Sequence, residues 1–143
     1  MDYGRVIGVV IVVGLVLLSG CGGGGGSGGP AVTGPAVSGL TIGGAPKFTG
    51  GPVTLSGHVT ASAGVSTVVA KVTRPEGTMT SVPLSNVGGD LYTGVFNAPA
   101  NDSTAAKTYS VVIVAADSAG RSTTSVPMTF SVPCPVAPPP PPA

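Results

Sequence analysis

The chain has few side chains that could do chemistry, and they stand far apart along the sequence. It holds two cysteines, one histidine and only 8% charged residues. The carboxylates that follow residue 21 each lie in or beside a turn-like stretch, and they are Glu76, Asp90, Asp102 and Asp117. A Ca²⁺ site needs several oxygens from converging loops, and no Asp-x-Asp pair supplies them. We therefore expect no metal ligand, with a Ca²⁺ site at these turns as the alternative.

His58 is the only histidine, and it stands among serines and threonines that alternate with apolar residues. That alternation places it on the outer, solvated face of a strand. A catalytic role would need an acid that orients the imidazole and a nucleophile beside it, and the neighbouring sequence supplies neither. We predict that the chain is not an enzyme and has no catalytic residue; a hydrolase is the alternative.

A glycine run follows Cys21 and matches the pattern Gly-x-Gly-x-x-Gly at Gly23, Gly25 and Gly28. A dinucleotide site needs that pattern between a strand and a helix of a βαβ unit, whereas any run of glycines produces the match. We therefore expect no cofactor. The run instead predicts a flexible linker over residues 22–29.

Cys21 itself has the most informative surroundings in the chain. Residues 6–18 form an apolar segment behind a short head with one arginine, and this segment ends in Leu18-Ser19-Gly20-Cys21. The order resembles the lipobox of bacterial lipoproteins, where a Leu and two small residues precede the Cys that closes the signal peptide. The resemblance implies cleavage between Gly20 and Cys21, diacylglycerol on the thiol, and an acyl chain such as palmitate on the new N-terminus. Several fatty chains together give a stable membrane anchor.

An uncleaved transmembrane helix is the alternative for the same segment, because no charged residue stands between Arg5 and Lys47. Residues 6–18 are short for a hydrocarbon core of about 30 Å, and each following glycine costs a helix about 1 kcal/mol relative to alanine. In both cases we expect the rest of the chain outside the cytoplasm. The lipid-anchored form is expected at the cell membrane or outer membrane, with its domain facing the periplasm or the exterior.

The charge pattern argues against a nucleic-acid partner. The net charge is +1, and the basic residues beyond residue 21 stand singly rather than in a cluster: Lys47, Lys71, Arg74, Lys107 and Arg121. Neutralising several phosphates requires such a cluster. No nucleic acid is therefore expected among the partners.

The middle of the chain predicts an all-β domain. Apolar residues alternate with polar ones, and turn-forming residues separate the stretches. Seven strands are expected, near residues 40–42, 53–60, 68–72, 78–84, 91–97, 107–116 and 126–132. The stretch 78–84 is the most polar and suits a sheet edge, whereas 107–116 is the strongest, with Tyr109, Val111, Ile113 and Ala115 on one face. Seven short antiparallel strands in this length favour a β-sandwich.

This pattern resembles bacterial immunoglobulin-like and fibronectin type III-like domains. The resemblance rests on Leu91-Tyr92-Thr93-Gly94 and on Lys107-Thr108-Tyr109-Ser110-Val111, which runs into Asp117-Ser118-Ala119-Gly120. It implies that the Tyr109 hydroxyl bonds backbone at a corner of the sandwich. Val111 stands where antibody domains have their second cysteine, and no tryptophan is present.

The expected organisation has four parts: a lipoprotein signal peptide (1–20), the lipidated cysteine with its glycine-rich linker (21–35), the sandwich (36–133) and a proline-rich tail (134–143). Cys134 is expected to be an odd thiol if Cys21 carries lipid, and a disulfide partner of Cys21 if it does not. The expected function is a lipid-anchored structural or interaction module that binds an envelope protein or a glycan. The alternative is an accessory subunit that docks on an envelope assembly through the tail.

Overall fold

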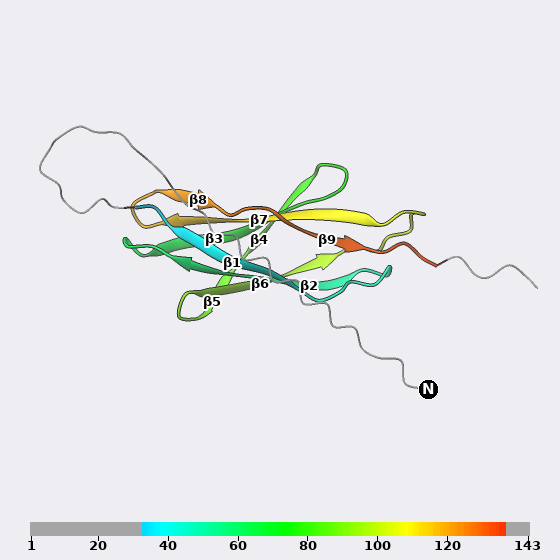
Figure 1. Ribbon diagram of the computed structural model, residues 1–143, viewed down its shortest axis with the longest axis horizontal. Coiled ribbons are helices and arrows are strands. Elements are labelled where there is room, and N and C mark those ends of the chain that lie inside the picture. Colours follow the sequence, from blue (N-terminus) through cyan, green and yellow to red (C-terminus); the bar gives the residue numbers. More distant parts are fainter. Residues whose placement is uncertain (1–32, 137–143) are drawn as a thin grey trace, which may run out of the picture. The chain divides into compact units, whose positions relative to one another are not determined.

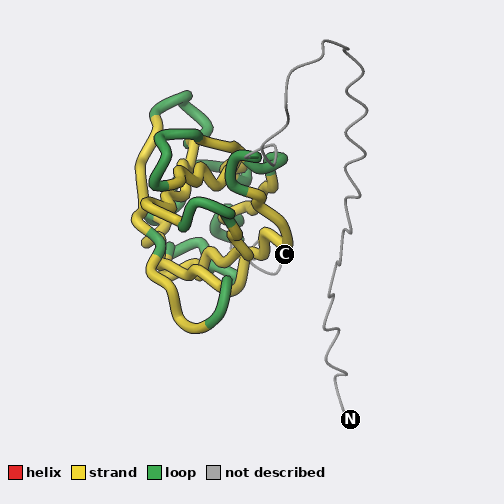
Figure 2. Tube along the Cα trace, turned by 90° about the vertical axis from the view of Figure 1, so that its left-hand side faces the viewer, coloured by secondary structure: helices red, strands yellow, loops and turns green. Residues whose placement is uncertain are grey.

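The computed structural model describes residues 33–136, and every regular element in that range is a β-strand (Figure 2). The chain divides into two units, Met1–Pro30 and Ala31–Ala143, and the described residues all belong to the second. The strands are β1 (Ala36–Gly43), β2 (Gly51–Thr60), β3 (Val65–Thr73), β4 (Met79–Pro83), β5 (Ser85–Gly88), β6 (Leu91–Ala98), β7 (Lys107–Asp117), β8 (Ser122–Thr124) and β9 (Met128–Val132).

The strands form two antiparallel sheets that lie in two layers (Figure 1). One sheet has the order β1-β2-β6-β5. The other has the order β4-β3-β7-β8, and β9 pairs with β7 as well. The all-β, sandwich-like part of the prediction is therefore confirmed.

The predicted last strand, residues 126–132, is wrong at its start. Strand β8 pairs with the second half of β7 and β9 with the first half, so the intervening residues 125–127 interrupt one edge. Pro127 has no N–H to donate to a ladder, and Val126 is 63% exposed rather than facing the core. The Ser125 hydroxyl accepts from the Ile113 amide at 2.9 Å, which satisfies the amide at this interruption.

Strand β5 was not expected from the sequence, which reads there as a turn. Its residues are all exposed, and it pairs only with β6, with a register shift between Asn86 and Gly88. The Asn86 side chain closes the following turn, because its Nδ2 donates to the Gly89 carbonyl at 2.8 Å and its Oδ1 accepts from the Gly88 amide at 3.0 Å. A strand without apolar alternation leaves no hydrophobic signal to detect.

The core lies between the sheets and is lined by the faces that alternation predicts. On β7 the side chains of Tyr109, Val111, Ile113 and Ala115 are all buried. Strand β2 contributes Gly57 opposite Ile113: a Cβ at this glycine would lie 2.5 Å from Ile113 Cδ1, too close for two carbon atoms. Glycine therefore makes room for the larger side chain of the other sheet.

Three aromatic rings fill one part of this core. Tyr109 stacks on Phe130 with ring centroids 4.9 Å apart and planes 5° apart, and Phe96 meets both rings at a tilt. Tyr109 is only 1% exposed, and this burial raises the pKa of its hydroxyl. The expected bond from this hydroxyl to backbone is not formed with any residue between 33 and 136, so that detail of the resemblance was wrong.

The described chain starts and ends at opposite ends of the sandwich (Figure 1). Ala36 of β1 pairs with Thr60, next to the β2–β3 turn, and Ser62 in that turn bonds to Thr33. Val132 of β9 pairs instead with Lys107, the first residue of β7. A segment that precedes Thr33 and one that follows Val136 therefore join the sandwich at different ends.

Candidate functional site

The predicted lipidation site, Cys21, and the predicted cleavage site between Gly20 and Cys21 lie outside the described residues, as does the proline run 138–142. Within residues 33–136, no helix is long and apolar enough to cross a membrane.

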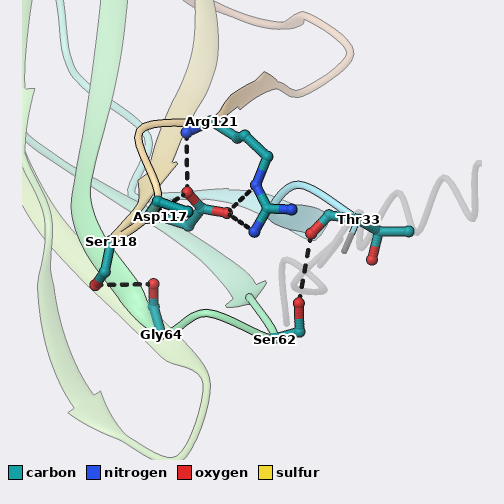
Figure 3. Close-up of polar contacts among 7 residues, drawn as sticks. Thr33, Ser62, Gly64, Asp117, Ser118 and Arg121 are labelled. Atoms are coloured by element: carbon teal, nitrogen blue, oxygen red, sulfur yellow. Dashed lines mark hydrogen bonds and ion pairs between the residues drawn. The ribbon is translucent and has the colours of Figure 1, made fainter. Parts of the chain in front are cut away.

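Three sets of polar contacts lie at the end of the sandwich where the described chain begins: Thr33 with Ser62, Gly64 with Ser118, and Asp117 with Arg121 (Figure 3). The Ser62 hydroxyl donates to the Thr33 carbonyl at 3.5 Å, and Ser118 donates to the Gly64 carbonyl through its backbone amide at 3.0 Å. These bonds join the first described residues, the β2–β3 turn and the β7–β8 turn.

Asp117 has the largest number of contacts among these residues, all with its own turn. Its side chain is fully buried, and Arg121 approaches it with Nε at 2.8 Å and Nη2 at 2.7 Å from the same oxygen, Oδ2. The other oxygen, Oδ1, accepts from the backbone amides of Ala119 and Arg121 at 3.0 and 2.9 Å. Burial alone would raise the pKa of Asp117, but the hydrogen bonds and charge of Arg121 outweigh burial and hold the pKa below its usual value.

Asp117 was expected to be a turn residue whose side chain accepts from backbone amides, and the structure confirms that role. The ion pair with Arg121 was not predicted. It lies at (i, i+4) spacing across a hairpin turn instead of along a helix, so the usual sequence rule for such pairs does not apply. The arrangement is structural: every oxygen of the carboxylate has a donor from its own turn.

His58 and Asp90 form a second pair that the sequence did not reveal. His58 Nδ1 lies 3.0 Å from Asp90 Oδ1, and the two side chains are 48% and 49% exposed. The hydrogen bond from His58, followed by bonds to backbone, lowers the pKa of Asp90. His58 does face solvent, as predicted, but it is paired rather than solitary.

An imidazole oriented by a carboxylate is two thirds of a hydrolytic triad, in which a nucleophilic hydroxyl is the third member. Ser38 stands directly opposite His58 in the β1–β2 register. However, no hydrogen bond joins His58 to any hydroxyl among residues 33–136, and the pair sits half-exposed on the outer face of a sheet. An acyl-transfer site also needs oxyanion donors in a site that excludes water. We interpret the pair as a hydrogen-bonded pair on the protein surface.

The contacts of Glu76 lie within its own turn. Glu76 accepts from the Thr78 hydroxyl at 3.0 Å and lies 3.9 Å from Arg74 Nη1; its pKa is lowered, first by backbone bonding and then by Thr78. Among the residues that the structure describes, no three His, Cys, Asp or Glu side chains are grouped so that they could hold a metal ion.

Asn101 is the buried residue that sequence reasoning missed. Its side chain is 0% exposed, and its Nδ2 donates to the carbonyls of Ala105, Val132 and Pro133 at 2.8, 3.0 and 3.1 Å. It thus ties the β6–β7 loop to the point where β9 ends. The sequence Asn101-Asp102-Ser103 reads as a glycosylation sequon, but the folded domain encloses the amide. Cys134, just beyond, is half-buried and free.

Comparison of the chain with known proteins gives no match, either to a protein-family model or to a curated protein.

Proposed function

We propose that this protein is a membrane lipoprotein, anchored through lipid on Cys21, whose all-β domain is a non-enzymatic interaction or structural module of the cell envelope. The observation that carries the proposal is the order of segments. An apolar stretch (6–18) ends at Leu18-Ser19-Gly20-Cys21, glycines follow, and the first strand begins at Ala36.

The strand order supports an immunoglobulin-like interpretation of the domain. In constant-type immunoglobulin domains strands A, B, E and D share one sheet and strands C, F and G the other. The order β1-β2-β6-β5 against β3-β7-β8 matches that distribution, with β4 as an extra edge strand beside β3. Tyr109 lies in β7, the counterpart of strand F, two residues before Val111.

The described domain also fits a module that presents surfaces away from its anchor. The lipid would precede Thr33, which lies at the end of the sandwich that carries the Asp117–Arg121 pair. The opposite end, with the β1–β2 and β6–β7 loops, would then face outward. An envelope protein or a glycan is the expected partner class.

Metabolic labelling with radioactive palmitate tests the anchor. The wild-type protein should incorporate label and lose residues 1–20, whereas Cys21→Ser should take up no label and keep those residues. Cys134→Ser is the matched control and should behave as wild type. Equal labelling of Cys21→Ser and wild type would contradict the proposal, and an unlabelled wild type that keeps residues 1–20 would support a transmembrane helix instead.

The second candidate is an accessory subunit that docks through its tail. Removing residues 135–143 should abolish co-purification with an envelope assembly if the tail is the docking element. If co-purification persists, the domain itself makes the contact.

A further inference from the structure

We draw no further inference here: the strongest candidate, the tight turn between β1 and β2 that presents Phe48 at 45% exposure while the Phe48 carbonyl accepts from the Asn101 amide at 2.7 Å, carries no proposal because nothing in the described residues 33–136 shows what covers that ring.

Discussion

Arg121 lies against the carboxylate of Asp117, four residues before it, with Nε and Nη2 both within 2.8 Å of one oxygen. Two backbone amides of the same turn bind the other oxygen. This pair closes the β7–β8 hairpin at the end of the sandwich where the described chain begins, so its loss should destabilise that hairpin.

Asp117→Asn should lower the melting temperature by about 5 °C or more, since a buried charged acceptor becomes a neutral amide that also presents a donor to Arg121. Differential scanning calorimetry measures the change. Asp102→Asn is the matched control, because Asp102 is exposed in the β6–β7 loop, and it should melt within about 1 °C of wild type. Similar melting of both variants would show that the pair does not stabilise the fold.

The acid sensitivity of the domain should depend on the same carboxylate. The pKa of Asp117 is lowered in the folded state, so its contribution is fully present above the unfolded value of about 4 and is lost as the pH falls through the folded pKa. Denaturation at a series of pH values should show wild type losing stability in this range more steeply than Asp117→Asn. Asp90→Asn is the control: Asp90 also has a lowered pKa but is half-exposed, so the wild-type slope should persist. Parallel profiles for wild type and Asp117→Asn would contradict the assignment.

The ring of Tyr109 should contribute strongly to the free energy of unfolding, whereas its hydroxyl should contribute little. A lost hydrogen bond would cost about 1 kcal/mol, but the hydroxyl bonds to no residue of the described domain, so Tyr109→Phe should change the free energy of unfolding by less than about 0.5 kcal/mol. Tyr109→Ala removes the ring that stacks on Phe130 and should cost about 3–5 kcal/mol. Urea denaturation distinguishes the two. A large loss in Tyr109→Phe would show that the hydroxyl has an essential partner.

Adjacent valines on β7 should respond in opposite ways to one substitution. Val111 is 0% exposed and faces the core, while Val112 points to the outer face. Val111→Asp buries an unpaired charge and should leave the domain unfolded, whereas Val112→Asp should fold. Dispersion of amide signals in NMR spectra checks both. If Val112→Asp also unfolds, or Val111→Asp folds, the register of β7 is wrong.

Much of this fold could be predicted because hydrophobic alternation specifies which face of a strand is buried. The alternation along β2, β3 and β7 places the core side chains correctly. Alternation says nothing where a strand is wholly exposed, and β5 was therefore missed. The last strand was predicted over residues 126–132 and therefore ran through Pro127, although a proline in that position argues for an interruption.

The polar contacts were less predictable because they depend on register and on loop conformation. His58 and Asp90 are 32 residues apart in sequence, and only the pairing of β2 with β6 brings them together. Asn101 resembles an ordinary loop residue, and nothing local signals that three carbonyls converge on its amide.

The most direct test of the account is mass spectrometry of the N-terminal peptide from the membrane-bound protein. We predict that the mature chain begins at Cys21, that its sulfur carries diacylglycerol, and that residues 1–20 are gone. A chain that retains residues 1–20 and has an unmodified Cys21 thiol would contradict the proposal that lipid holds this domain at the membrane.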